Sequence, residues 1–303
     1  MPVNAGPAAG VNVQRPQRAS ARTDDVEARK ARRRIGLAER MPPSMDSSAQ
    51  PPGSVVGYVR AMTGQLITVS GGALQAAYLH GSAVLGGWVP GRSDVDMLFV
   101  TADGIGGGVV ERMGQALCEA AGRCPGRELE CSVVTVAQAG RPAPPWPFVL
   151  HVAAGPGKPG RMVHSGSRSP GDADLLMRYA VCRTAGWPVC GPPAGELIGV
   201  VPRRVILDHL AGQLAWGIEH ASEAYAVLNA CRALIYLTDG KIMSKIAGGE
   251  AVLGRGTGPA EVIQRALGQQ RGAEPDQPPA ADAVGFVLAT AAALRSAAGE
   301  HAG

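Results

Sequence analysis

The spacing of hydrophobic positions changes once along the chain. Up to about residue 200, short apolar runs typical of strands alternate with segments of helical period. Strands are expected at residues 76–79, 94–100, 129–136 and 148–152, and helices at 55–68, 106–121 and 172–184. After Pro202 only helical spacing remains, at 203–220, 223–238, 244–253, 260–268 and 280–297. This pattern predicts a mixed-sheet α/β domain followed by an all-α helical bundle.

The same pattern divides the chain into three parts. Residues 1–50 are rich in Pro, Ala, Gly, Arg and Ser, which predicts a disordered basic N-terminal extension. Residues 51–200 form the predicted α/β domain, and residues 201–303 form the bundle domain. Two folded domains suit a chain of 303 residues, since single cores stop growing near ~250–300 residues.

Two aspartates stand at the start of an apolar strand, in the run Ser93-Asp94-Val95-Asp96-Met97. Side chains two residues apart share one face of a strand, so Asp94 and Asp96 should project together. Two such carboxylates repel each other unless a cation lies between them. Mg²⁺ is the cation that suits carboxylate and phosphate oxygens. We therefore predict that Asp94 and Asp96 bind a metal ion.

A Gly-Ser turn precedes this strand by about a dozen residues, at Gly81-Ser82. Glycine lets the backbone approach a ligand closely, and amides at the start of an expected helix favour an anion. A phosphate-binding turn followed by a metal-binding strand is the arrangement that nucleotidyl transfer requires.

The full pattern G-S-x-x-x-G-G-x(5)-S-D-x-D resembles the nucleotidyltransferase superfamily. Further matches follow in order: residues 129–134 (LECSVV), 172–176 (DADLL), 189–193 (VCGPP), Arg232, and 240–245 (GKIMSK). The ordered set, over roughly residues 54–253, resembles the aminoglycoside (3″)(9)-O-adenylyltransferases, which modify streptomycin and spectinomycin. Because the resemblance begins near Val55, Met41 and Met45 are open alternatives to Met1 as the start.

The resemblance implies a role for each matched residue. Glu130 corresponds to the proposed base that takes the proton from the acceptor hydroxyl. Glu128, two residues earlier on the same strand face, is the competing candidate, and the register of the motif favours Glu130. Contacts with the triphosphate of ATP, the implied co-substrate, fall to Gly81, Ser82, Ser93, Arg232 and Lys245.

The acceptor pocket is less well specified by the sequence. A polycationic antibiotic requires carboxylates and a flat apolar wall. Residues 216–225 contain both, but do not align one to one with the family. The candidates for acceptor binding are Trp216, Glu219, Glu223 and Tyr225. The predicted acceptor therefore stays open between streptomycin, spectinomycin and an unrelated alcohol.

Composition excludes several other classes. The net charge of +4 is concentrated in residues 12–40, whereas a nucleic-acid surface needs a basic face within the folded domain. No apolar run approaches the ~18–20 residues of a membrane span. We expect a monomeric cytoplasmic enzyme without nucleic-acid or membrane partners. The alternatives are transfer to another metabolite or a protein hydroxyl, and a non-catalytic nucleotide sensor, which would have no need of Glu130.

Overall fold

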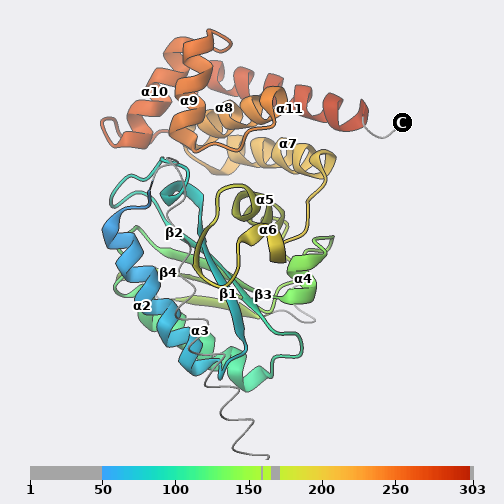
Figure 1. Cartoon of the computed structure of the whole chain (residues 1–303). Helices are drawn as coiled ribbons and strands as arrows, with labels where there is room; N and C mark the ends of the chain where they lie inside the picture. The colour runs from blue at the N-terminus through green and yellow to red at the C-terminus, as the bar shows by residue number, and fades with distance from the viewer. Residues whose placement is uncertain (1–49, 158–159, 165–170, 301–303) are drawn as a thin grey trace, which may run out of the picture.

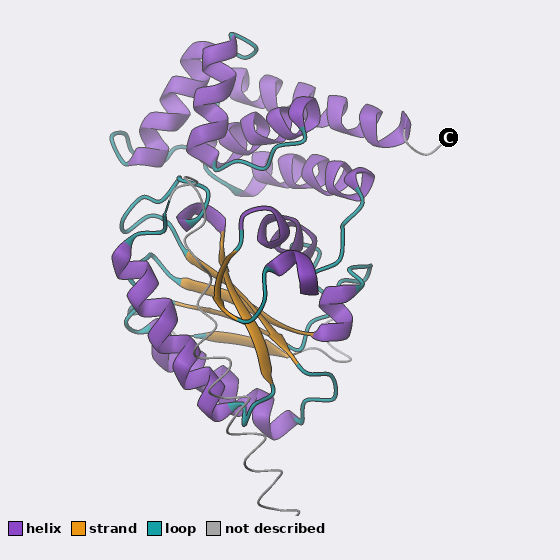
Figure 2. Cartoon of the chain, in the orientation of Figure 1, coloured by secondary structure: helices purple, strands orange, loops and turns teal. Residues whose placement is uncertain are grey.

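The α/β domain is built on a mixed sheet (Figures 1 and 2). The computed structural model describes residues 50–157, 160–164 and 171–300, so nearly all of the expected N-terminal extension lies outside the described residues. The strands are β1 Leu74–His80, β2 Val95–Thr101, β3 Leu129–Thr135, β4 Leu150–Ala154, β5 Arg161–His164 and β6 Trp187–Cys190. Their order is β5-β4-β3-β2-β1-β6. Strands β2 and β3 are parallel, and the other neighbouring pairs are antiparallel.

Helices cover both faces of the sheet. In the α/β domain they are α2 Gly53–Val69, α3 Gly107–Ala121, α4 Val136–Gly140, α5 Leu175–Ala185 and α6 Ala194–Leu197. The bundle consists of α7 Arg203–His220, α8 Glu223–Asp239, α9 Lys245–Arg255, α10 Ala260–Arg271 and α11 Ala281–Glu300. Helices α2 and α3 lie on one side of the sheet, whereas α5 lies between the sheet and the bundle (Figure 1).

The alternation of side chains along each strand creates two apolar cores. Leu79, Met97 and Phe99 face α2 and α3 in a core confined to the α/β domain. On the opposite face, Tyr78 and Leu98 belong to a core that continues through α5 into the bundle. The two domains are therefore distinct along the sequence but share one apolar core on the α5 side of the sheet.

The long helices and central strands lie where periodicity predicts them, and the differences concern short elements. Strand β5 falls within residues 155–170, whose richness in Gly, Pro and Ser is typical of a loop. Strand β6 is not among the expected elements, and it contains Pro188, which cannot donate a hydrogen bond to a neighbouring strand. It is an edge strand, the position where proline is tolerated in a sheet.

Helix α11 is apolar enough to deserve separate mention. By length and composition alone, Ala281–Gly299 could cross a membrane, with a mean hydropathy of 1.3. Its side chains Ala283, Val287, Ala291 and Leu294 are buried in the core shared with α7 and α8. Only 33% of this span is buried inside the described structure, so packing in the bundle accounts for one face of the helix.

Candidate active site

Three carboxylates gather on the sheet face that α5 and the bundle cover. Asp96 on β2 is directly opposite Glu130 on the parallel strand β3, and Asp94 precedes Asp96 by two residues. Burial, followed by the charges of Glu130 and Asp94, raises the pKa of Asp96 well above its ordinary value. The cluster therefore carries like charges at short range, which favours a cation among them.

Gly81 brings the backbone against this cluster. Its φ is +69°, and a Cβ at this position would lie 2.0 Å from Oδ2 of Asp96. Only glycine fits there without moving the carboxylate. The expectation of a helix starting at Gly81-Ser82 is wrong, because Gly81–Ala83 is a single 3₁₀ turn. A long-helix dipole therefore contributes nothing at Ser82, and close backbone approach is the feature of this turn that remains.

Ser93 lies in the loop that leads into β2. It is buried, and its hydroxyl oxygen accepts a hydrogen bond of 2.9 Å from the backbone N–H of Val89. Its backbone N–H in turn donates to the Val89 carbonyl. The structure thus gives Ser93 a part in shaping the loop, and its contact with a phosphate stays a prediction.

Two cations enter from the bundle. Arg232 is on α8, and Lys245 is the first residue of α9. Gly248 lets these helices approach closely, since a Cβ there would lie 2.9 Å from Cα of Arg232. Burial and the neighbouring Arg232 lower the pKa of Lys245 to about 8, while Asp94 and Asp96 oppose the shift. Both cations therefore lie within electrostatic range of the carboxylate cluster.

The guanidinium of Arg232 has unused hydrogen-bonding capacity. Its Nε is buried, and none of the described residues accepts a hydrogen bond from it. Burial also lowers the pKa of Arg232. Asn229, one helical turn earlier on α8, has a buried side-chain amide next to the Tyr225 hydroxyl. A buried donor without an acceptor is costly, so this face of α8 suits an anionic or polar ligand.

Contacts on two sides hold the bundle against the α/β domain. In the loop before β2, Gly87 packs against Ser244, where a Cβ would lie 2.4 Å from the serine Cβ. Arg92 in the same loop forms a 2.6 Å ion pair with Asp276. At the start of α5, Asp174 accepts a 2.5 Å hydrogen bond from Gln213 of α7.

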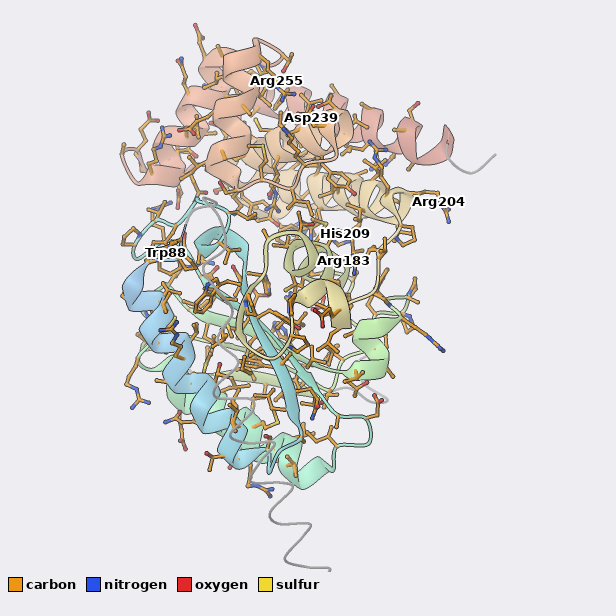
Figure 3. All side chains as sticks on the ribbon, in the orientation of Figure 1. Trp88, Arg183, Arg204, His209, Asp239 and Arg255 are labelled. Carbon is orange, nitrogen blue, oxygen red and sulfur yellow. The ribbon has the colours of Figure 1, made fainter. Side chains whose placement is uncertain are left out.

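His209 of α7 adds to the second of these contacts. Its Nε2 lies 3.5 Å from Oδ1 of Asp174. Figure 3 shows His209 at the junction between α7 and α5, above Arg183. The carboxylates and the two bundle cations therefore face each other across a junction that is tied on both sides.

Two arginines that the sequence analysis missed are paired with the carboxylates. Arg127 contacts both oxygens of Asp94, at 2.9 and 2.7 Å. Arg178 of α5 donates from Nη2 to Oε1 of Glu130 at 2.5 Å. Arg178 interrupts the apolar stripe of its helix, in Leu175-Leu176-Met177-Arg178-Tyr179. A charge inside an apolar run is a signal that the sequence offers for Arg178, as it does for Glu130 in residues 129–134 (LECSVV), whereas Arg127 gives no such signal.

Arg178 is itself fixed by a buried polar network. Its Nη1 donates to Oγ of Ser132 and lies 3.1 Å from Nδ1 of His151, and its Nη2 lies 3.6 Å from Oδ2 of Asp172. Burial and the nearby Arg178 lower the pKa of His151 to about 4, which keeps its imidazole neutral at pH 7. A neutral ring can accept a hydrogen bond at Nδ1.

The four acceptor-site candidates fall in different places. Glu223 is buried within the bundle, where its carboxylate accepts hydrogen bonds from Arg265 and from the Ala280 N–H. The expectation that Glu223 binds the acceptor is therefore corrected, because its oxygens serve bundle packing. Trp216 is 52% exposed and stacks on His220 at 5.2 Å.

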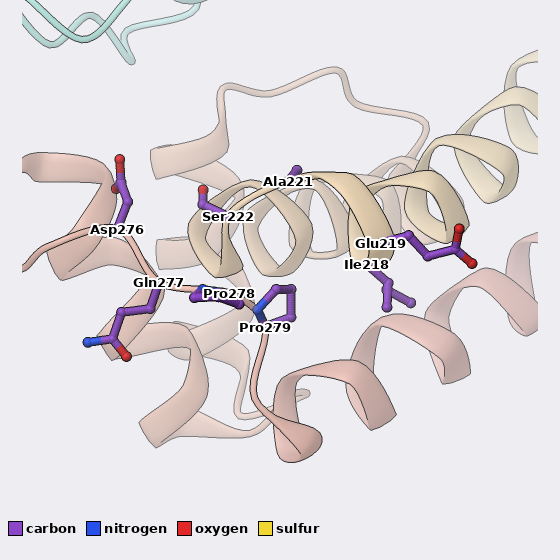
Figure 4. Close-up of a pocket in the computed structure, with 8 residues that line it drawn as sticks. All are labelled: Ile218, Glu219, Ala221, Ser222, Asp276, Gln277, Pro278 and Pro279. Carbon is purple, nitrogen blue, oxygen red and sulfur yellow. The ribbon is translucent and has the colours of Figure 1, made fainter.

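Tyr225 and Glu219 differ in their distance from the cluster. The Tyr225 ring lies 4.6 Å from Nζ of Lys245 and edge-on to Trp216, so this aromatic pair adjoins the predicted phosphate-binding cation. Glu219 lines a pocket of about 380 Å³ on the bundle, shown in Figure 4. The pocket is bounded by Ile218, Glu219, Ala221, Ser222, Asp276, Gln277, Pro278 and Pro279. None of the three carboxylates lines it, so this pocket is separate from the candidate active site.

Asp94 and Asp96 are the donors that the cluster offers to a metal ion. Among the described residues, no group of three or more His, Cys, Asp or Glu side chains is arranged to hold a metal ion by itself. Mg²⁺ does not require such a cage, since it is usually bound through one or two carboxylates and substrate phosphates. The close carboxylates Asp94 and Asp96, beside a glycine that admits a ligand, fit that mode.

Comparisons with known proteins bear on the family and the fold. Residues 197–292 match the family model described as the aminoglycoside adenylyltransferase C-terminal domain. Over these residues the chain is similar to the aminoglycoside adenylyltransferases. A search of curated proteins finds no significant match. The family-model match at residues 197–292 confirms the predicted resemblance, and the matched family is one of enzymes.

A solved structure supports the fold of the whole enzyme. It is described as spectinomycin adenyltransferase AAD(9) from Enterococcus faecialis with ATP and spectinomycin. The similarity covers 81% of this chain and 98% of that chain, with a TM-score of 0.56 and 18% sequence identity. The predicted fold class, a mixed-sheet nucleotidyltransferase domain followed by a helical bundle, is confirmed.

Proposed function

We propose that this adenylyltransferase transfers AMP from ATP to a hydroxyl of an aminocyclitol or aminoglycoside antibiotic of the spectinomycin or streptomycin class. The observation that carries the proposal is the meeting of Asp94, Asp96 and Glu130 on one sheet face with Arg232 and Lys245 of the bundle. The relative of known structure, which was solved with ATP and spectinomycin, supports the choice of both substrates. The product is an adenylylated, inactive antibiotic.

Glu130 is the proposed general base. Its side chain is one-third exposed and faces the junction, so it can meet an acceptor hydroxyl. Burial raises the pKa of Glu130 while Arg178 opposes the shift, and a base whose pKa approaches neutrality is a more effective proton acceptor. The deprotonated hydroxyl oxygen then attacks the α-phosphorus of ATP, and the bond to pyrophosphate breaks.

Asp94 and Asp96 are the residues that would hold Mg²⁺. When bound, the ion would neutralise phosphate oxygens and so make the phosphorus more open to attack. Arg127 occupies both oxygens of Asp94, so this exposed pair must open for the carboxylate to act as a ligand.

Arg232 and Lys245 are the proposed ligands of the β- and γ-phosphates. Pyrophosphate leaves with several negative charges, and fixed cations stabilise that charge in the transition state. Phosphate contact would also satisfy the unpaired Nε of Arg232. Since both cations belong to the bundle, nucleotide binding would tighten the junction between the domains. Gly81 and Ser82 would contact the triphosphate from the sheet side, and Ser93 remains a further candidate.

Trp216 and Tyr225 are the proposed aromatic wall for the acceptor, because Tyr225 lies beside Lys245 and Trp216 packs against Tyr225. Glu219 is retained as a weaker candidate, since its pocket lies apart from the carboxylates. We further propose that the enzyme acts as a monomer in the cytoplasm, where ATP is available.

The proposal is tested by pyrophosphate release from ATP and Mg²⁺ with spectinomycin, with streptomycin and without acceptor. Release should depend on one of the antibiotics, with mass spectrometry showing one added adenylyl group. Asp96→Asn should lose more than ~10²-fold of this rate, because even outer-shell partners of a metal are worth 10–100-fold. Release that is independent of any acceptor, or an unchanged rate for Asp96→Asn, would contradict the proposal.

A further inference from the structure

We propose that Arg178 is a positioning residue for Glu130, which it holds by one carboxylate oxygen so that the other is presented to the acceptor hydroxyl. The inference rests on the proposed function, in which Glu130 is the general base. It concerns a residue that is buried on α5 and reaches the site only through Glu130 and its neighbours.

The contact between the two side chains is one-sided. Arg178 Nη2 donates to Oε1 of Glu130 at 2.5 Å, and none of the described residues donates a hydrogen bond to Oε2. The Glu130 side chain is 33% exposed, whereas that of Arg178 is 10% exposed. One oxygen of the base is thus anchored in the protein interior while the carboxylate still reaches the junction.

The guanidinium of Arg178 is also held at its second terminal nitrogen. Ser132 on β3 and His151 on β4 hold Nη1, and Asp172 before α5 lies near Nη2. These partners come from three different segments, so the guanidinium cannot rotate without breaking buried contacts. A planar guanidinium fixes direction as well as charge, which an ammonium group does not.

The arrangement also explains why a charged residue interrupts an apolar helix. Leu175 and Tyr179, its neighbours on the same stripe of α5, belong to the apolar core. A pair of apolar side chains at 130 and 178 would give a more stable fold than a buried ion pair, because no charge would lose its hydration. Arg178 is useful at this position if the carboxylate of Glu130 must be held in one orientation.

The test is a kinetic cycle in the full-length enzyme. Arg178→Met keeps the approximate volume and removes the guanidinium. We expect kcat for acceptor-dependent transfer to fall about 10²-fold, the scale of a misplaced catalytic group, with KM for ATP and acceptor changing less than about 3-fold. Arg178→Lys keeps the positive charge but lacks the planar guanidinium, so it should recover only part of the rate. This variant also controls for loss of folding in Arg178→Met.

The decisive comparison is made in a Glu130→Gln background. Adding Arg178→Met to Glu130→Gln should slow transfer by no more than about 2-fold, because residues that act as a unit are not additive. Arg183→Met is the matched control on the same helix. Arg183 donates to the carbonyls of Gly195 and Ile198 and should affect stability while leaving kcat unchanged (Figure 3).

The outcomes distinguish failure of the role of Arg178 from failure of the role of Glu130. Full loss of activity in Glu130→Gln with near-native kcat in Arg178→Met overturns this inference and leaves the proposed function intact. The same follows if the two substitutions multiply, or if Arg183→Met lowers kcat as much as Arg178→Met. Native kcat in Glu130→Gln overturns the role of the base itself, and the role of Arg178 with it.

Discussion

Two carboxylates of the same cluster are each paired with an arginine, and the two pairs differ in burial. The Arg127 side chain is 53% exposed and its partner Asp94 is 20% exposed, whereas Arg178 is 10% exposed and its partner Glu130 is 33% exposed, so the contrast lies in the arginines. An exposed pair contributes about 0–1 kcal/mol and can exchange its partner readily. A buried pair breaks only at a high cost, since a charge is left without compensation.

This difference matches the tasks proposed for the two acids. Asp94 must release its arginine to take a metal ion, so a weak, solvent-exposed pair is suitable. Glu130 must keep a fixed direction through the reaction, so a buried arginine that is held by other residues is suitable. The sheet rim thus combines an exchangeable acid with an anchored one, separated by Asp96.

Removing either arginine should have its largest effect on the free energy of unfolding. Arg178→Met should lower the free energy of unfolding by about 3 kcal/mol, at the low end for a buried pair because Glu130 keeps part of its surface in water. Arg127→Met should lower it by less than about 1 kcal/mol. Urea titrations followed by circular dichroism measure both. Equal losses for the two variants would contradict the assignment of one fixed and one exchangeable pair.

A smaller effect is expected on the affinity for Mg²⁺ when the exposed Arg127 is removed. Arg127→Met should strengthen Mg²⁺ binding about 2–5-fold, because the ion no longer competes with a guanidinium for Asp94. Calorimetry with a non-hydrolysable ATP analogue measures this affinity without turnover. Arg123→Met removes the same charge from the same loop without touching the contact to Asp94. An increase of equal size in that control would point to general electrostatics instead.

The sequence predicts most of the fold and the acidic part of the site for a physical reason. Period-2 and period-3.6 patterns specify which side chains share a face, which is enough to place Asp94 and Asp96 on one side of their strand. Glu130 is indicated by the family resemblance, and its position opposite Asp96 depends on the pairing of β2 with β3. Short edge strands such as β6 carry too few residues to show a period. Pairings between segments distant in sequence, such as Arg178 with Glu130, depend on which helix covers which strand.

The acceptor side shows the opposite behaviour. Acidic and aromatic residues cluster in the sequence at 216–225, yet helix geometry separates them in space. Glu223 turns into the bundle toward Arg265, while Tyr225 turns toward Lys245. Composition within a segment therefore identifies candidates, and only the direction of each side chain along α7 and α8 decides among them.

The central claim is that Glu130 removes the proton in the chemical step, and a single-turnover measurement tests it most directly. Enzyme in excess over ATP is mixed with Mg²⁺ and the accepted antibiotic, and AMP transfer is followed by rapid quench. Glu130→Gln should transfer about 10²–10⁴-fold more slowly than the native enzyme, the range for loss of a general base, while binding ATP with native affinity. A transfer rate within a few-fold of native would contradict the account.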